Sequence, residues 1–213
     1  PLMDLASKYN LFVVEDAAQA IDSFYKGKPL GTIGHLSTFS FHETKNITAG
    51  EGGLLGINDE RFVKRAEIIW EKGTNRTSFF RGEVNKYGWV DTGSSFLPSE
   101  LNAAFLWGQL EYLNKIQQRR KAIWEVYYNE LATIVESVGI KLPQLPDYAT
   151  NNGHMFYLIC QSIEQRQALI NYLKEKGILA VFHYLSLHKN KKCRLLHFLG
   201  QLTTISFTIW VLY

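Results

Sequence analysis

The sequence predicts an α/β protein, in which β-strands alternate with amphipathic helices along the chain. Three observations lead to this prediction: short β-favouring runs, helical apolar patterns between them, and polar residues directly after the first two runs. Apolar residues make up 46% of the 213 residues and aromatic residues 14%. This composition suits a large buried core and excludes a disordered or collagen-like chain.

The first hundred residues contain most of the expected strands. A helix over residues 2–9, stopped at Asn10, precedes a strand at 11–14 of the kind buried on both faces of a parallel sheet. Further strands are expected at 36–41 and 53–57. A helix beginning at Asn58 or Asp59 and ending at Gly73 follows them.

A loop over residues 74–98, rich in Gly, aromatic and basic residues, separates this part from a long helical pattern that begins at Ser99. We expect that helix to bend or break within residues 117–121. Beyond it the pattern predicts a strand at 154–160, a helix from Ser162 to Gly177 and a strand at 178–182. The expected domains are 1–120, 121–188 and a divergent tail, 189–213.

Charge and cysteine content limit which partners and which cellular compartment we expect for the protein. The net charge is 23 − 20 = +3, which gives no sign of a nucleic-acid partner. Cys160 and Cys193 are too few for a disulfide framework, so a reducing, cytoplasmic location is expected. Residues 195–213 carry no Asp, Glu, Lys or Arg, but Thr, Ser, Gln and Gly residues interrupt the apolar character of this stretch. We interpret them as the product of a disrupted reading frame rather than as a membrane anchor.

Three features in the first half point to one chemistry: Asp16 after a strand, Lys45 after the next, and the glycine cluster at 50–53. Separately, they are typical of a cap, a surface charge and a turn. Together they meet the needs of pyridoxal phosphate. This cofactor requires a lysine that holds it as a Schiff base, an acid beside its ring nitrogen and donors for its phosphate. No metal site is expected.

Two long motifs carry a resemblance to a known family. Leu-Phe-Val-Val-Glu-Asp-Ala-Ala-Gln-Ala (11–20) and Ser-Phe-His-Glu-Thr-Lys-Asn-Ile-Thr-Ala-Gly-Glu-Gly-Gly (40–53) resemble the DegT/DnrJ/EryC1/StrS sugar aminotransferases from residue 2 to about 188. This implies the fold of pyridoxal-phosphate-dependent transferases of type I (aspartate aminotransferase-like), with a partial large domain and a small C-terminal α/β domain. Residues 71–76 and 87–100 are similar to the branch that makes dTDP-4-amino-4,6-dideoxygalactose.

The resemblance assigns roles to five residues. Lys45 is the lysine that holds the cofactor and serves as the catalytic base and acid. Asp16 faces the pyridine nitrogen, and Ala18 lies against the ring. Gln19 hydrogen-bonds the ring hydroxyl, and Ser40 donates to the cofactor phosphate.

Substrate contacts follow less directly from the same resemblance. Arg76 and Arg81, with Lys86, are candidates for the diphosphate of a sugar nucleotide or for a neighbouring subunit's cofactor phosphate, because a guanidinium fork suits phosphate oxygens. A solvated basic loop is the alternative. His183 and Tyr184, together with His154 and His188, lie in the region that lines the sugar site in relatives.

The implied reaction is transamination from L-glutamate to a dTDP-linked 4-keto-6-deoxy sugar, in a homodimer with shared sites, for cell-surface polysaccharide precursors. The family's fold is nearly twice as long as this chain, so we expect an N-terminally truncated chain. The alternative is a non-catalytic fragment with an incomplete cofactor site. Lys45 argues against the related dehydratases, which carry histidine there, and no Gly-x-Gly-x-x-Gly or phosphate-loop pattern supports a generic nucleotide-binding module.

Overall fold

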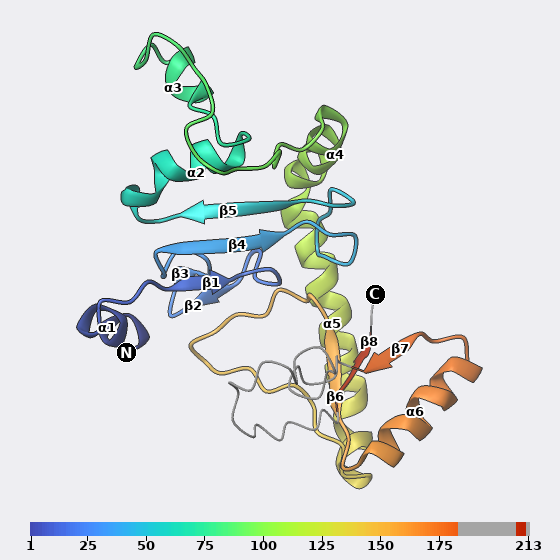
Figure 1. The fold of residues 1–213 in the computed structure, drawn as a ribbon. Coiled ribbons are helices and arrows are strands. Elements are labelled where there is room, and N and C mark those ends of the chain that lie inside the picture. Colours follow the sequence, from blue (N-terminus) through green and yellow to red (C-terminus); the bar gives the residue numbers. More distant parts are fainter. Residues whose placement is uncertain (183–207, 212–213) are drawn as a thin grey trace. The chain divides into compact units, whose positions relative to one another are not determined.

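The computed structural model describes residues 1–182 and 208–211, which form two units (Figure 1). The first unit contains Pro1–Gln118 together with Asp147–Asn152. The second contains Arg119–Pro146 and the described residues from Gly153 onward. The predicted boundary at residue 120 lies close to the division within the long helix, but the return of residues 147–152 to the first unit has no counterpart in the prediction.

The first unit is built on a three-stranded sheet in the order β1-β4-β5 (Figure 1). The central strand β4 (Leu36–Ser40) runs parallel to β1 (Val14–Asp16) and antiparallel to β5 (Gly53–Ile57). Asp16 pairs with Thr38, and Ser40 pairs with Gly53. The carboxyl ends of β1 and β4 therefore meet at one edge of the sheet, which is where ligands bind in open α/β sheets.

The chain enters this sheet through helix α1 (Leu2–Lys8), and Asn10 adopts the expected left-handed conformation with φ 51°. The strand then begins three residues later than predicted, at Val14 instead of Leu11. Leu11 and Phe12 stay largely exposed, and the Phe12 ring packs edge-on against His35 and Phe62. The prediction of burial on both faces was wrong for this run, because Leu11, Phe12 and Val14 are each more than half exposed.

A small hairpin between β1 and β4 was not predicted. Strands β2 (Phe24–Tyr25) and β3 (Lys28–Pro29) pair antiparallel around Lys26 and Gly27, whose φ angles of 50° and 76° are both positive. Two consecutive positive φ angles are the requirement of the tightest hairpin turns. The turn lacks the Asn-Gly or Asp-Gly pair that usually indicates this conformation, so the hairpin could not be predicted from its turn residues.

Short helices follow β5, as expected. Asp59 caps a 3-10 turn η1 (Glu60–Phe62), its carboxylate accepting from the Arg61 backbone N–H, and α2 (Val63–Trp70) continues from it. Gly73 follows this helix with φ 77°, as a helix-ending glycine should. The predicted loop 74–98 contains one short helix, α3 (Arg76–Phe80).

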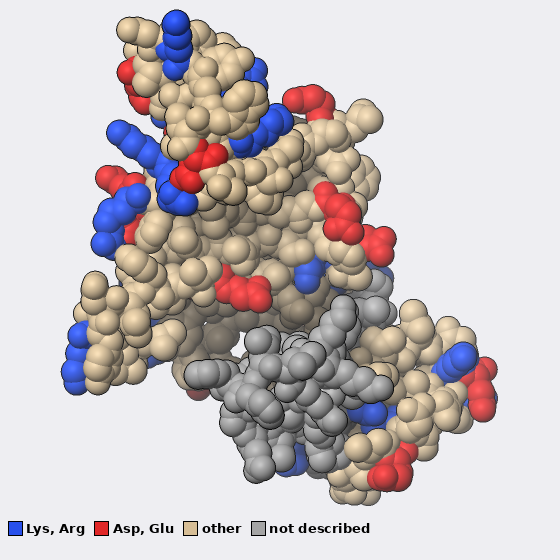
Figure 2. All heavy atoms as spheres, viewed as in Figure 1, with Lys and Arg blue, Asp and Glu red and all other residues tan. Residues whose placement is uncertain are grey.

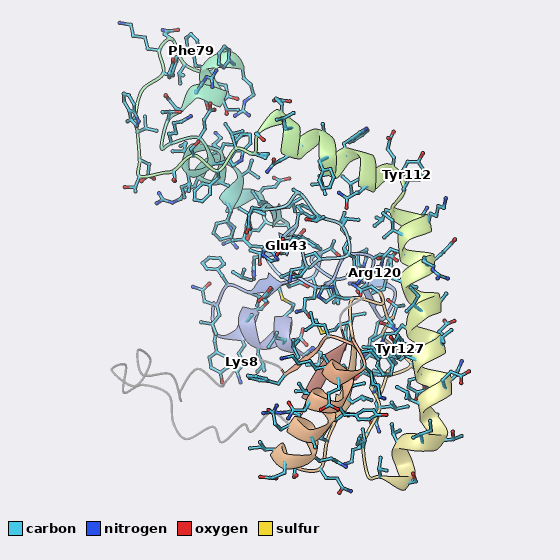
Figure 3. The ribbon with its side chains drawn as sticks, turned by 90° about the vertical axis from the view of Figure 1, so that its right-hand side faces the viewer. Lys8, Glu43, Phe79, Tyr112, Arg120 and Tyr127 are labelled. Carbon is cyan, nitrogen blue, oxygen red and sulfur yellow. The ribbon has the colours of Figure 1, made fainter. Side chains whose placement is uncertain are left out.

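Two consecutive helices follow this loop. Ser99 caps α4 (Glu100–Glu111) by accepting from the Asn102 backbone N–H, and α5 (Leu113–Ser137) continues after Tyr112, which Figure 3 labels where the two helices meet. The predicted break at 117–121 is wrong, since α5 runs through it. The prediction relied on the polar residues of this stretch, but Gln117 is only 2% exposed, and its amide is hydrogen-bonded inside the first unit.

The second unit combines the rest of α5 with α6 (Ile163–Glu175) and a sheet in the order β6-β8-β7. Its strands are β6 (Phe156–Ile159), β7 (Ala180–Phe182) and β8 (Thr208–Val211), with β8 antiparallel to both neighbours. The predicted cap is present, as Ser162 accepts from the Gln165 backbone N–H. β8 was not predicted, because residues 189–213 were interpreted as a divergent tail.

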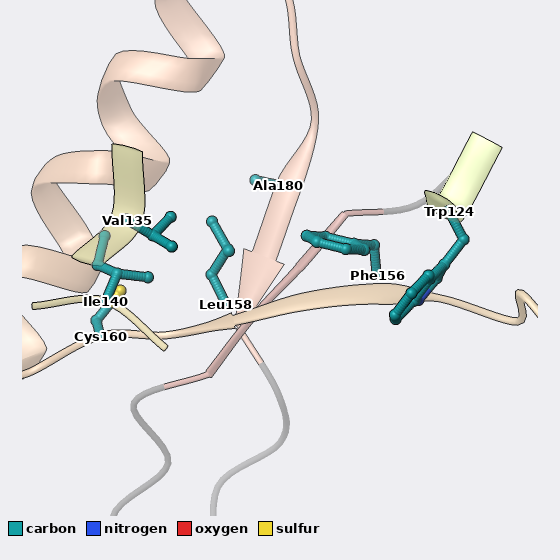
Figure 4. Close-up of a cluster of buried hydrophobic side chains, with 7 residues drawn as sticks. All are labelled: Trp124, Val135, Ile140, Phe156, Leu158, Cys160 and Ala180. Atoms are coloured by element: carbon teal, nitrogen blue, oxygen red, sulfur yellow. The ribbon is translucent and has the colours of Figure 1, made fainter. Parts of the chain in front are cut away.

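The core of the second unit is a cluster of buried apolar side chains (Figure 4). Phe156 is fully buried, and its ring meets Trp124 edge-on at 5.4 Å between centroids. Leu158 and Cys160, on the same strand face, extend the cluster. Truncating a buried phenylalanine to alanine costs about 3–5 kcal/mol, so Phe156 anchors this unit.

Within the described ranges, no helix combines the length and the apolar character that crossing a membrane requires.

Candidate active site

Two neighbouring carboxylates end β1, and the structure gives them different surroundings. The Glu15 carboxylate accepts three backbone N–H groups, from Gly31 at 2.9 Å, Ile33 at 2.7 Å and Gly34 at 2.6 Å. Among the described residues, the Asp16 carboxylate accepts only from the Ala18 backbone N–H, at 3.2 Å, and its side chain is exposed. Glu15 therefore holds a turn, whereas Asp16 keeps acceptor capacity for a ligand.

Ser40 ends the neighbouring strand at the same edge. Asp16 is level with Thr38, so Ser40 lies about 7 Å further along β4. Its Oγ accepts from the His42 backbone N–H at 3.3 Å. A hydroxyl that accepts one hydrogen bond still has its own hydrogen to donate, and a phosphate oxygen is a suitable acceptor.

Lys45 lies in the loop that connects β4 to β5, two residues after Glu43, which Figure 3 labels. Its backbone N–H donates to the His42 carbonyl at 3.0 Å, and its side chain is half-buried. In the part of the chain that the structure describes, no carboxylate forms an ion pair with the Lys45 ammonium. No carboxylate of these ranges therefore competes with a ligand for this amine.

The loop around Lys45 is fixed on its C-terminal side. Ile47 is 1% exposed and packs in an apolar cluster with Phe41 and Ala49, against side chains that include Leu106. The Thr48 backbone is held at both polar atoms by Gln109 of α4, because its N–H donates to Oε1 at 3.0 Å and its carbonyl accepts from Nε2 at 2.6 Å.

A second set of contacts fixes the loop directly beside the lysine. The buried Asn46 side chain donates from Nδ2 to Gln117 Oε1 at 2.7 Å and to the Asn152 carbonyl at 2.9 Å. Asn152 donates in turn to the Gln19 and Ile21 carbonyls, at 2.8 and 2.9 Å. The segment after Asp16 and the loop of Lys45 are thereby joined through side-chain amides.

The sequence prediction missed Asn46, Gln109, Gln117 and Asn152. No periodic or motif signal identifies a buried amide, and each of these residues is exposed by default in a sequence-based analysis. The nearest available signal was the motif itself, because Asn46 directly follows Lys45. The partners that bury it are 71 and 106 residues away, so only the folded chain brings them together.

The other residues predicted to hold the cofactor lie in the same segment. Ala18 follows the end of β1 and is partly buried, and Gln19 is exposed. Only the backbone of Gln19 is fixed, by Asn152. The roles of Ala18 at the ring face and of Gln19 at the ring hydroxyl stay predictions.

The basic residues Arg76 and Arg81 form internal ion pairs. Arg81 donates to Glu67 at 2.7 and 2.8 Å and to Glu83 at 2.7 Å, and Arg76 pairs with Glu71. Figure 2 shows cationic and anionic side chains side by side over the α2–α3 region. Hydrogen bonds from Arg81 lower the pKa of both Glu67 and Glu83, so both carboxylates stay charged at neutral pH. A diphosphate would have to compete with them.

The histidines and tyrosine predicted for the sugar site divide into two groups. His183, Tyr184 and His188 lie outside the described residues. His154 is described, and it is 9% exposed in the second unit, where its backbone carbonyl accepts from Arg120 at 2.8 Å. Their contacts with a substrate stay predictions.

The residues at the sheet edge fit pyridoxal phosphate by their chemistry. A lysine amine without an ion pair within the described ranges, an exposed carboxylate at a strand end and a serine hydroxyl supply the three functions that this cofactor needs. The three groups come from one edge of one sheet, in the first unit.

Comparison with known proteins gives the same answer. The chain is 31% identical over 184 residues to GDP-perosamine synthase of Escherichia coli O157:H7, and 29% identical over 194 residues to the protein MJ1066 of Methanocaldococcus jannaschii. These matches cover 83% and 88% of this chain but 45% and 49% of the relatives. The chain thus spans about half the length of the curated relatives it matches.

Solved structures agree with the fold. Spr1654 of Streptococcus pneumoniae, described as a sugar aminotransferase and solved in its pyridoxal phosphate form, superposes with a TM-score of 0.80 at 25% identity. This match covers 97% of the present chain and 54% of that one. The fold is therefore that of type I pyridoxal-phosphate-dependent transferases, as the sequence predicted.

The family model of these enzymes matches residues 1–199, which is 11 residues beyond the point to which the motifs alone suggested a resemblance. Its enzymes use pyridoxal phosphate, the cofactor that the residues at the sheet edge fit. The chain belongs to the DegT/DnrJ/EryC1/StrS aminotransferase family.

Proposed function

We propose that this chain carries the lysine-bearing part of a transaminase that moves an amino group from L-glutamate to the 4-keto carbon of a dTDP-linked 6-deoxy sugar. The observation that supports the proposal is Lys45, which has no ion-pair partner in the described ranges and lies on a fixed loop that begins at the strand end of Ser40. Relatives that include GDP-perosamine synthase support a sugar nucleotide as the substrate class.

When bound, pyridoxal phosphate supplies an aldehyde that takes up the amine and a pyridinium ring that accepts electrons from the substrate carbon. Asp16 would hold the ring nitrogen, and its negative charge would raise the pKa of that nitrogen. Ser40 would donate its hydroxyl hydrogen to a phosphate oxygen. Lys45 would remove the proton from the donor carbon and later return one to the acceptor carbon.

The overall reaction balances without an external oxidant. L-glutamate loses its amino group and becomes 2-oxoglutarate, while the keto carbon of the sugar gains that group and becomes an amine. The donor carbon is oxidised by two electrons and the acceptor carbon is reduced by two. Arg76 and Arg81 are proposed to bind the diphosphate after exchanging their carboxylate partners.

Two further features belong to this proposal. The two cysteines are too few for a disulfide framework, which supports a cytoplasmic enzyme. An exposed apolar stripe on α4, formed by Leu101, Phe105, Gly108 and Tyr112 at helical spacing, supports a homodimer. Apolar residues on the opposite side of the helix, such as Leu106, already pack beside Ile47, and a helix that is apolar all round is normally buried.

Titration of the purified 213-residue chain with pyridoxal phosphate tests the proposal. We expect visible absorbance from the lysine-bound cofactor, and borohydride reduction followed by peptide mass analysis should find the label on Lys45. Lys45→Ala should abolish both signals, because no other amine stands at this sheet edge in the same loop. Lys64→Ala, which removes an exposed lysine of α2, is the matched control and should keep both.

The alternative, a non-catalytic fragment, has one observation in its favour: the chain spans about half the length of its relatives. A folded chain whose Lys45 is not labelled at saturating cofactor would establish that alternative and refute our proposal.

A further inference from the structure

We propose that the amide side chains of Asn46, Gln117 and Asn152 form a positioning device that holds Lys45 in register with the segment after Asp16. This inference rests on the proposed function, and it names residues that act through Lys45 rather than on the substrate. We call these three side chains the amide network.

The amide network connects segments that are far apart in the sequence. Asn46 is next to Lys45, and its Nδ2 reaches Gln117, 71 residues away, and the Asn152 carbonyl, 106 residues away. Asn152 Nδ2 then reaches the carbonyls of Gln19 and Ile21, 133 and 131 residues away. Two side chains are thus enough to link the lysine loop to the segment that follows β1.

Every member of the network is buried. Asn46 and Asn152 are each 6% exposed and Gln117 is 2% exposed. Gln117 adds two donations from Nε2, to Asp22 at 3.2 Å and to the Asn152 carbonyl at 3.3 Å. A buried amide that loses a partner suffers the full cost of desolvation, so the network is cooperative and tolerates few alternative arrangements.

The chemistry at Lys45 explains why such precision matters. The ring of the cofactor would be held by Asp16 on one segment, whereas its aldehyde must meet an amine on another. Covalent attachment joins the amine and the aldehyde with loss of one water molecule, and misplacement of reacting groups by about 1 Å costs on the order of 10²-fold in rate. Fixing the two segments to each other removes that source of error.

Other contacts hold the lysine loop without directional bonds to the segment that follows Asp16. The Gln109 clamp fixes Thr48 to α4. The Ile47 cluster packs against Ile21 of that segment, but apolar packing does not set the direction of the contact as hydrogen bonds do. The hydrogen bond from Asn46 to the Asn152 carbonyl is the one that continues, through the Asn152 side chain, to Gln19 within the described residues.

Asn46→Ala tests the inference against a matched variant, Asn58→Ala. The Asn58 side chain also donates to two backbone carbonyls, of Gly31 at 2.9 Å and Gly34 at 3.0 Å, but it lies beyond the opposite end of β4, where Leu36 pairs with Ile57. We expect Asn46→Ala to lower the equilibrium constant for attachment of pyridoxal phosphate at Lys45 by at least about tenfold. Asn58→Ala should stay within about twofold of the unaltered chain.

Gln117→Met provides a second variant with a similar side-chain volume. It removes one partner of Asn46 and keeps the other, so its loss of attachment should be smaller than that of Asn46→Ala. The double variant Asn46→Ala/Gln117→Met should be no worse than Asn46→Ala alone, because both changes break one network. Thermal unfolding midpoints of all variants are measured in parallel. The inference would be overturned if Asn46→Ala and Asn58→Ala had equal thermal unfolding midpoints and lowered the equilibrium constant for cofactor attachment by the same factor.

A measurement without cofactor separates this inference from the proposed function. Amide hydrogen exchange in Asn46→Ala should accelerate at Ala49 in the lysine loop and also at Ser23, whose N–H donates to Ala20 in the other segment. In Asn58→Ala both amides should exchange as in the unaltered chain. Exchange that changes at Ala49 alone would show that the segments are not coupled, whether or not the chain binds pyridoxal phosphate.

Discussion

Glu15 and Asp16 show how the direction of a side chain decides its role. Both are carboxylates at the end of β1, and successive side chains of a strand point to opposite faces. Glu15 meets the turn at 31–34 and is saturated by three backbone N–H groups, whereas Asp16 retains its acceptors. Composition cannot distinguish the two residues, but the pleat of the strand does.

Asp59 gives a testable pH dependence at this scale. The Arg61 guanidinium donates to its carboxylate and lowers the Asp59 pKa from 3.8 to about 2. A carboxyl whose pKa is lower in the folded state stabilises the fold above its unfolded pKa, and that contribution disappears as the pH falls through the folded pKa. Asp59→Asn should therefore lower the urea midpoint at pH 7, and the difference should close between about pH 4 and pH 2.

Asparagine is also a good N-cap, so this substitution keeps the cap hydrogen bond and removes only the charge. Arg61→Gln, which removes the other half of the pair, should show the same pH dependence. A difference from the unaltered chain that is the same at pH 7 and pH 2 would contradict the assignment.

At the scale of elements, the end of α2 depends on one glycine. Gly73 has φ 77°, and a Cβ there would press on the carbonyl oxygen of Asp91 in the loop that follows α3. Gly82 has nearly the same φ, 76°, but a Cβ there meets nothing within 4 Å. The two glycines therefore separate the cost of backbone conformation from the cost of a steric clash.

We predict that Gly82→Ala lowers the free energy of unfolding by about 1–2 kcal/mol, the cost of a left-handed conformation for an L-residue. Gly73→Ala should lower it by more, because the 88–95 segment must also move. Urea denaturation of both variants measures the difference. Equal losses would mean that the approach of Asp91 to Gly73 is not a constraint in solution.

The long helices show what periodicity can and cannot predict. The predicted start of the helix at Ser99 is confirmed, because Ser99 is its N-cap and a cap is a local signal. The break was placed at 117–121 from its polar residues, yet it lies at Tyr112. Gln117 points into the first unit, where the amide network satisfies it, so a polar residue in a helix is evidence of exposure only when no partner is available.

At the scale of the whole molecule, the apolar stripe on α4 predicts self-association. Phe105 is 58% exposed in this stripe, and Leu101 is 83% exposed. Phe105→Asp should weaken the dimer at least about tenfold, as expected for an apolar anchor near the centre of an interface. Sedimentation velocity across a concentration series measures this.

Val126→Asp is the matched control, since Val126 is 60% exposed on α5 outside the stripe and gains the same charge. It should leave the association constant unchanged. Equal weakening by both variants would assign the effect to charge, and a chain that stays monomeric at all concentrations would exclude a dimer through α4.

By itself, the sequence determined the α/β class, most strands and helices, the helix start at Ser99 and the cap at Ser162, and it predicted the pair Asp16 and Lys45, because these signals lie within a few neighbouring residues. The tertiary structure decided which carboxylate stays available, where the long helices separate, and which amides hold the lysine loop. These features depend on contacts between residues up to 133 positions apart. A side chain that is buried by residues far away in the sequence belongs to no periodic pattern, so only the folded chain reveals its burial.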